Sequence, residues 1–273
     1  MIDLTRVDTD LYAMVTPVVD ELIAGVDLDP DNILLIGAGC RDILHASLGH
    51  TFRARATTDT DLGIAVGDWT TTQRIEARFR RTGSNGIRYM IAGTPVDIMP
   101  FGDIEDPEGI SVPAPRREEL VVFGFRDVHA HALPLLLPSG TTIRLPQPAG
   151  YAALKMRSWI DRSAHFNQDK DAKDLAMAAF WYQNAPEIED RIYATDIGFD
   201  LLTELDMDFD RAAVRLLGLD ASAQLSPVNR HDLSRRWAEQ DLSTLARDFK
   251  LPASGPHTAD LDRRKEIVAQ LQL

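Results

Sequence analysis

The stretch TTDTDLGIAV (57–66) places two aspartates, Asp59 and Asp61, at the point where an apolar strand begins. Residues at i and i+2 of a strand project from the same face, so we expect the two carboxylates to be neighbours. Like charges at that spacing repel each other, which costs free energy unless a cation lies between them. Mg²⁺ (or Mn²⁺) would neutralise both, because it prefers carboxylate oxygens together with phosphate oxygens. The alternative is an acidic loop with exposed aspartates.

A third aspartate, Asp97, lies in the stretch TPVDIMPFG (94–102), between Val96 and Ile98. An aspartate inside an apolar strand is unfavourable without a partner. We therefore expect its strand to adjoin the strand led by Asp59 and Asp61, so that three carboxylates converge. Such a set can hold two metal ions, one positioning a triphosphate and one activating an attacking hydroxyl. Because the carboxylates repel one another, neutralising one is expected to cost little stability.

Upstream, the strand NILLIG (32–37) runs directly into Gly37-Ala38-Gly39 and a helix. Glycines at such a junction let backbone N–H groups approach a phosphate, and the helix N-terminus adds partial positive charge. A tight strand-to-helix turn would need glycine in any case. The third glycine and the acidic residue of a dinucleotide fingerprint are missing, so the motif does not predict an NAD site.

The organisation of the chain changes near Pro146 and Pro148. Before this point strands and helices alternate, with turns expected at 93–95 and 138–140. The pattern predicts strands at 32–37, 62–66, 87–92, 96–101, 128–137 and 141–145, and helices near 9–25, 40–49 and 69–83. Afterwards the periodicity is helical, at 149–163, 168–184, 197–205, 208–217, 230–245 and 260–272. We predict an α/β (α+β) catalytic domain over 1–148, with a mixed sheet and flanking helices, and a helical domain over 149–273.

In the helical half, Lys155 and Arg162 are seven residues apart and hence on one helix face, and Asp171 and Asp174 open the next helix. Lys155 could neutralise phosphate charge. The equally open alternative is an ion-pair network between the two helices.

The net charge of −13 argues against a protein that coats nucleic acid without specificity. A local exception is 67–100, where five arginines accompany three acidic residues. Of these arginines, Arg74, Arg78 and Arg81 would share one face of the predicted helix and could bind phosphates.

The single cysteine excludes an intrachain disulfide, and the apolar runs are far shorter than the ~20 residues that span a bilayer. The chain start lacks the layout of a signal peptide, so we expect a cytoplasmic protein. His129 and His131 are expected to share a strand face and to be structural.

These elements, in this order, resemble the polymerase-β-type nucleotidyltransferase superfamily, whose members pair a glycine motif with Asp-x-Asp and a later third aspartate. More narrowly, LLIGAGCRDIL, RATTDTDLGIAV, VDIMPFGDIE and LKMRSWIDR with KDAKDL are similar to AbiEii/AbiGii-type nucleotidyltransferase toxins. The resemblance covers roughly residues 30–180. It implies metal ligation by Asp59, Asp61 and Asp97, triphosphate contacts from Gly37, Gly39, Thr58 and Lys155, and Asp174 as the late acidic residue of the toxin pattern.

The resemblance also implies a reaction and its partners. The expected activity is Mg²⁺-dependent transfer of a nucleotide from an NTP to RNA, such as a tRNA 3′ end, by a toxin that could have a cognate antitoxin. Transfer to a small molecule or a protein side chain is a second possibility, and non-catalytic nucleotide binding is a third. The intact set of three aspartates argues against the third.

Overall fold

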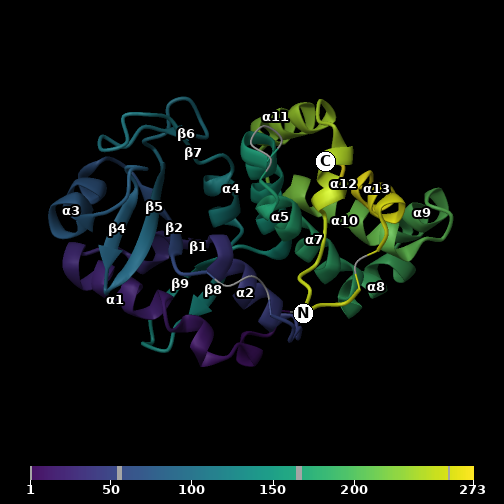
Figure 1. The fold of residues 1–273 in the computed structure, drawn as a ribbon, viewed down its shortest axis with the longest axis horizontal. Helices are drawn as coiled ribbons and strands as arrows, with labels where there is room; N and C mark the ends of the chain where they lie inside the picture. The colour runs from purple at the N-terminus through teal and green to yellow at the C-terminus, as the bar shows by residue number, and fades with distance from the viewer. Residues whose placement is uncertain (1, 54–56, 164–167, 258) are drawn as a thin grey trace. The chain divides into compact units, whose positions relative to one another are not determined.

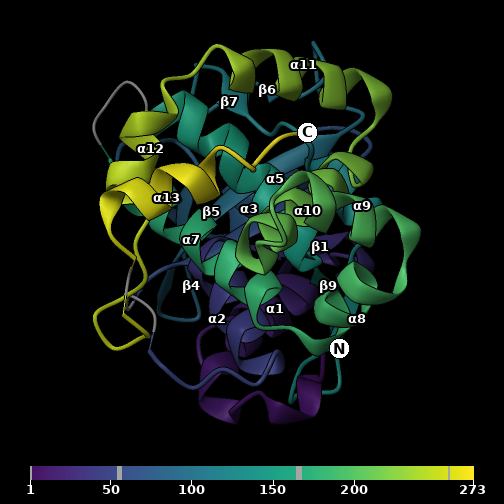
Figure 2. The same cartoon turned by 90° about the vertical axis from the view of Figure 1, so that its right-hand side faces the viewer.

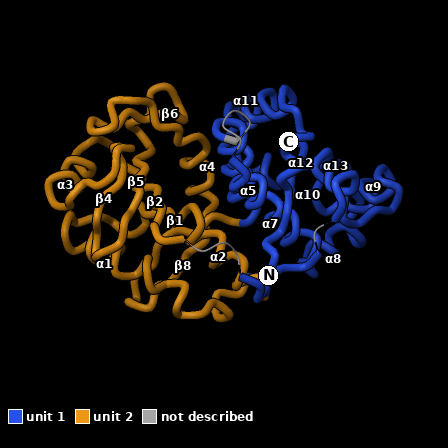
Figure 3. Tube along the Cα trace, viewed as in Figure 1, with its two compact units in different colours: residues 1–2, 50–54, 148–273 blue, residues 3–49, 55–147 orange. Residues whose placement is uncertain are grey.

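The computed structural model of the protein describes residues 2–53, 57–163, 168–257 and 259–273. The chain forms two compact units (Figure 3). Residues 3–49 and 55–147 form one, called here the sheet unit, and residues 1–2, 50–54 and 148–273 form the other, the helical unit. The chain passes between them at Gln147–Pro148, one residue from the expected boundary. The inclusion of 50–54 in the helical unit was not expected from the sequence.

The sheet unit is built on seven strands in the order β3-β4-β5-β2-β1-β9-β8 (Figure 1). The central strand β2 is parallel to β5 and antiparallel to β1, and β1 is parallel to β9. This arrangement confirms the predicted mixed sheet. The strands are β1 (Ile33–Ile36), β2 (Thr60–Val66), β3 (Arg80–Arg81), β4 (Arg88–Ile91), β5 (Thr94–Gly102), β8 (Leu133–Leu136) and β9 (Thr142–Leu145). A separate pair joins β6 (Ile110–Ser111) to β7 (Leu120–Val121).

Apolar helix faces cover this sheet. Helix α1 (Val15–Val26) buries Val18, Val19 and Leu22 completely and packs on α3 (Thr70–Arg78). Helix α4 (Phe125–Ala130) packs on β5, where the rings of Phe125 and Phe101 meet edge to face at 5.7 Å. Gly63 of β2 leaves room for both rings, because a Cβ there would lie only 3.2 Å from each. Helix α2 (Gly37–Ser47) follows β1 directly.

The helical unit has three mutually packed helices, α5, α7 and α10, at its centre (Figures 1 and 2). Tyr151 packs its ring against Trp181 at 5.5 Å, and Trp159 against Trp237 at 5.6 Å. No described helix is both long and apolar enough to cross a membrane. The helices are α5 (Pro148–Ser158), followed by a π-helical turn (Trp159–Ser163), α7 (Lys170–Gln183), α8 (Pro186–Ala194), α9 (Asp196–Glu204), α10 (Phe209–Ala223), α11 (Pro227–Ala238), α12 (Leu242–Asp248) and α13 (Leu261–Val268).

Several predicted boundaries are wrong for local reasons. The helix expected over 69–83 ends at Arg78, because Phe79 is extended and buried, and Arg80–Arg81 then form β3. The helix expected over 230–245 is two helices, since Asp241 caps a new one by accepting from the N–H of Ser243 at 3.0 Å. Pro186 starts the unpredicted α8.

Three further predictions in the sheet unit need correction. The region 128–132 is not part of a strand, because α4 continues to Ala130; His129 and His131 therefore do not share a strand face. The helix expected over 9–25 is a 3₁₀ turn at Thr9–Tyr12 followed by α1. The hairpin between β4 and β5 turns at Ala92–Gly93 rather than at 93–95, with φ of 48° and 78° as a type I′ turn requires.

The buried position of Leu62 in β2 generates a stability prediction. Its side chain is fully buried in the central strand, so Leu62→Ala is expected to lower the free energy of unfolding by about 2–5 kcal/mol through the cavity it leaves. The matched control Leu136→Ala, on edge strand β8 with 63% of the side chain exposed, should change it by less than about 0.5 kcal/mol. Urea denaturation followed by circular dichroism measures both, and equal effects would contradict the assigned core.

Candidate functional site

The registers of three neighbouring strands bring Asp61, Asp97 and Arg88 into one row. In the parallel pair β2–β5 Asp61 lies opposite Asp97, and in the antiparallel pair β4–β5 Asp97 lies opposite Arg88. Residues directly opposite each other in a sheet project to the same face. The prediction that Asp97 lies on the strand next to that of Asp61 is therefore confirmed. We call Asp59, Asp61, Asp97 and Arg88 the aspartate row.

Arg88 binds two of the three aspartates. Its Nε donates to Oδ1 of Asp97 at 2.8 Å and its Nη2 to Oδ2 at 2.7 Å, a two-pronged pairing of guanidinium and carboxylate. The same Nη2 donates to Oδ2 of Asp59 at 2.7 Å. The hydrogen bonds that Arg88 donates to Asp97 are the main cause that raises the pKa of Arg88 above its ordinary value. One side chain thus neutralises two predicted metal ligands.

Asp59 is also held by Thr57, whose hydroxyl donates to Oδ1 at 2.7 Å. This bond is the main cause that lowers the pKa of Asp59; burial opposes it, and Arg88 lowers it further. The repulsion on which we based a small stability cost for neutralising Asp59 is therefore already offset by Arg88. That expectation loses its physical basis, because removing the carboxylate also removes two hydrogen bonds.

Asn85 shapes the loop that delivers Arg88. Its side-chain oxygen accepts from the backbone N–H groups of Ile87 and Arg88 at 3.2 and 3.1 Å, and its Nδ2 donates to Oδ1 of Asp97 at 3.2 Å. Asn85 was not expected at the site from the sequence, and Arg88 was expected only as part of a basic stretch. The signal that could have identified Arg88 is the hairpin: a two-residue turn at Ala92–Gly93 places Arg88 opposite Asp97.

Asp61 lies against the first residue of α2. A Cβ at Gly37 would be 1.9 Å from Oδ2 of Asp61, and Gly37 has φ of +66°. Glycine is thus required there both by space and by backbone conformation. The positive end of the helix dipole favours a carboxylate at this position.

Gly39 and Thr58, the other residues of the sheet unit predicted at the triphosphate, lack the close contact that Gly37 makes. At Gly39 a Cβ would meet Leu35 at an ordinary 3.5 Å, so the local packing does not require glycine there. Thr58 is exposed next to Asp59. The phosphate contacts of Gly37, Gly39 and Thr58 stay predictions.

The row suits a divalent metal in its chemistry. Carboxylate oxygens are the ligands Mg²⁺ prefers, and three carboxylates lie on or beside two adjacent strands. Within the described ranges, however, no three Asp, Glu, His or Cys side chains are grouped as a metal site. The guanidinium of Arg88 already bridges two of the candidate ligands. The carboxylate oxygens are suitable ligands for Mg²⁺, and Arg88 competes with the ion for those of Asp59 and Asp97.

In the helical unit, Lys155 has the ion pairs proposed as its structural alternative. Its Nζ lies 2.6 Å from Oδ2 of Asp174 and 3.4 Å from Oδ1 of Asp171, and Arg162 pairs with Asp171 at 3.0 Å. Burial alone would lower the pKa of Lys155, but the carboxylates of Asp174 and Asp171 outweigh it and raise the pKa. These bonds join α5 and the following turn to α7. The substrate contacts of Lys155 and Asp174 stay predictions.

The arginine patch predicted on one helix does not exist in that form. Arg74 and Arg78 are on α3, but Arg81 is on β3. Arg78 pairs with Glu21 at 2.9 Å, which ties α3 to α1. Arg74, Arg78, Arg80 and Arg81 are all exposed, and the last two lie on the strand beside the one that begins with Arg88.

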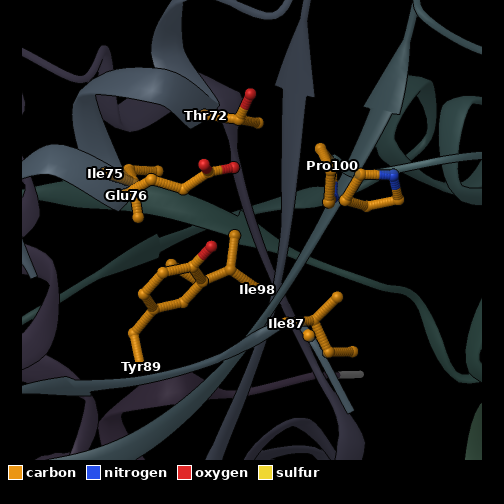
Figure 4. Close-up of a pocket in the computed structure, with 9 residues that line it drawn as sticks. Thr72, Ile75, Glu76, Ile87, Tyr89, Ile98 and Pro100 are labelled. Atoms are coloured by element: carbon orange, nitrogen blue, oxygen red, sulfur yellow. The ribbon is translucent and has the colours of Figure 1, made fainter. Parts of the chain in front are cut away.

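The sheet unit also contains a pocket, which Figure 4 shows. It is lined by Thr72, Ile75, Glu76, Gly86, Ile87, Tyr89, Ile98, Pro100 and Pro113. Successive strand residues alternate between faces, so Tyr89 and Ile98 project opposite to Arg88 and Asp97. Burial raises the pKa of Tyr89 to about 12 and, against the effect of Arg81, also raises the pKa of Glu76. We therefore do not assign this pocket to the aspartate row.

Comparison of the chain with protein-family models, with curated proteins and with solved structures finds no match. The functional assignment consequently depends on the geometry of the sheet unit and on the sequence motifs.

The two glycines of the strand–helix junction give a matched test. Gly37→Ala should lower the melting temperature markedly, because the methyl group would collide with the Asp61 carboxylate and the positive φ would be strained. Gly39→Ala, two residues later in the same helix, should be neutral or stabilising, because it has ordinary space. Thermal denaturation of both variants measures the two melting temperatures. A neutral Gly37→Ala would show that Asp61 does not lie against the helix end.

The buried position of Lys155 gives a second prediction. Lys155→Met should lower the free energy of unfolding by about 3–5 kcal/mol, because Asp171 and Asp174, with 2% and 6% of their side chains exposed, both lose the Lys155 ammonium, although Asp171 keeps its pair with Arg162. The control Lys173→Met removes an exposed ion pair between α7 and Asp169, the residue that precedes this helix. It should lower the free energy of unfolding by less than about 1 kcal/mol. Chemical denaturation measures the difference. If Lys155→Met is as stable as Lys173→Met, the ion pairs of Lys155 are not what holds α5 to α7.

Proposed function

We propose that the protein is a metal-dependent nucleotidyltransferase that uses an NTP as donor. The observation that supports this most directly is the register of the sheet, which sets Asp61 opposite Asp97 while Asp59 and Asp97 share one cation. Aspartates on adjacent strands are costly for a fold and give no core packing in return. They are well suited to holding cations beside a highly charged substrate.

In this proposal Asp59, Asp61 and Asp97 hold Mg²⁺ (or Mn²⁺), which would neutralise triphosphate charge and orient the α-phosphorus. Gly37 brings the backbone at the start of α2 next to Asp61, so phosphate oxygens bound beside the row would lie near the positive end of this helix. An acceptor hydroxyl attacks the α-phosphorus and the bond to the bridging oxygen breaks. Pyrophosphate leaves, and a carboxylate of the row takes the hydroxyl proton.

For the acceptor we propose RNA, such as a tRNA 3′ end, in line with the resemblance to nucleotidyltransferase toxins, for which a cognate antitoxin is a possible partner. The net charge of −13 requires local attraction for an RNA backbone. The exposed Arg80 on β3 offers it, because it pairs with Met90 and so lies on the same face of the sheet as Arg88. The helix face once expected to carry Arg74, Arg78 and Arg81 has no part in this proposal.

The activity test compares the wild-type protein with Asp59→Asn and Asp97→Asn. Each protein is incubated with each labelled NTP, Mg²⁺ or Mn²⁺, and total RNA, and labelled RNA is resolved on a gel. Loss of one ligand should reduce labelling at least about hundredfold, the size seen when a transition-state charge contact is removed. The control Asp103→Asn, 74% exposed and paired with Arg126 at the surface, should retain wild-type labelling.

The outcome also separates the alternatives. If the label appears on a small molecule or on protein and not on RNA, the proposed reaction stands but its acceptor is not RNA. Tight NTP binding with no transfer to any acceptor would point to a non-catalytic nucleotide-binding protein. Undiminished transfer by both variants would remove the aspartates from the mechanism.

A further inference from the structure

We propose that Arg88 is a positioning residue that regulates metal entry: it serves as the internal counter-ion of Asp59 and Asp97 and must release them before a divalent ion can bind between them. This inference rests on the proposed function, because it concerns the metal ligands of that site. It assigns to Arg88 a role that is distinct from holding the fold together.

The first argument is that the guanidinium and a metal would use the same atoms. The Oδ2 atoms of Asp59 and Asp97 both accept from Nη2 of Arg88 at 2.7 Å, so this nitrogen lies between the two carboxylates. A Mg²⁺ ion bound by the same two oxygens would approach each to about 2.0–2.1 Å. The two cations cannot occupy this position together.

The second argument is electrostatic. A divalent ion beside a guanidinium is repelled, and the repulsion is only partly screened because the Asp97 side chain is 14% exposed. Arg88 is 32% exposed and has a long stem, so it can move away. Metal binding must therefore include the free-energy cost of breaking the Arg88 hydrogen bonds.

The third argument is that the carboxylates keep other supports when Arg88 leaves. Thr57 still donates to Oδ1 of Asp59, and Asn85 still donates to Oδ1 of Asp97. The oxygens that lose their donor are the two Oδ2 atoms, the ones that face the bridging nitrogen. Removing Arg88 should consequently expose a binding position without dispersing its ligands.

The test is a Mn²⁺ titration in the absence of nucleotide, with free Mn²⁺ measured by electron paramagnetic resonance. Arg88→Gln should bind Mn²⁺ at least about tenfold more tightly than the wild-type protein, the factor that corresponds to one hydrogen bond to a charged group. Arg88→Lys, which keeps the charge but loses the fork, should fall between them. The matched control Arg126→Gln removes an exposed arginine of α4 that pairs with Asp103, with the same charge change, and should bind like wild type.

A melting experiment keeps the proposal testable if Arg88→Gln is less stable. In EDTA the variant should melt below the wild-type protein, because Asp59 and Asp97 lose their counter-ion. Added Mn²⁺ should raise its melting temperature more than that of the wild type, since tighter binding to the folded state gives a larger shift. In the double variant Asp59→Asn/Arg88→Gln, the tighter Mn²⁺ binding and the larger rise in melting temperature should both vanish. This result would assign the ion to the position between Asp59 and Asp97.

Three results would overturn the inference. Equal or weaker Mn²⁺ binding by folded Arg88→Gln and Arg88→Lys would make Arg88 a structural support and leave the proposed metal-dependent activity intact. A gain that persists in the double variant would place the ion elsewhere. Absence of Mn²⁺ binding by every variant would overturn both this inference and the proposed metal site.

Discussion

The central constraint on the sheet unit is that Asp61 and Asp97 face each other across adjacent parallel strands, and that a third aspartate, Asp59, precedes Asp61 by two residues. Apolar packing cannot satisfy such carboxylates, so a cation must come from elsewhere in the fold. Strand β4 provides it, because its antiparallel pairing with β5 puts Arg88 opposite Asp97. The long guanidinium side chain then reaches past Asp97 to Asp59. The order β4-β5-β2 in the sheet is therefore an electrostatic arrangement as well as a packing arrangement.

The position of the β4–β5 turn decides which residues meet. A type I′ turn at Ala92–Gly93 fixes the pairing of Arg88 with Asp97, and a turn one residue later would change every pair in the hairpin. Asn85 strengthens the same register from the other end, since it binds both the backbone of Arg88 and the carboxylate of Asp97. The geometry of the aspartate row thus depends on two short loops that carry no catalytic group themselves.

The helical unit solves a similar problem with buried charges. Asp171 and Asp174 are almost fully buried on α7, where Lys155 from α5 pairs with both and Arg162 also pairs with Asp171. Such a cluster adds specificity to helix packing only if all its members are paired, because an unpartnered buried charge is costly. Asp220 follows the same principle: it accepts from the Tyr182 hydroxyl at 2.8 Å and from Arg191 at 2.7 Å, and so joins α7, α8 and α10. Acidic side chains in this protein thus act repeatedly as connectors between elements.

The sequence by itself determined the alternation of strands and helices, the change to helices after Pro148, and the neighbourhood of Asp61 and Asp97. These features follow from local periodicity, from proline and glycine, and from the cost of an aspartate in an apolar strand. Only the tertiary structure decided that Arg88 bridges Asp59 and Asp97, that Gly37 touches Asp61, and that Arg81 leaves the helix of Arg74 and Arg78. Each of these depends on strand register or on a helix end, where a shift of one residue costs little in local preference but changes which side chains meet.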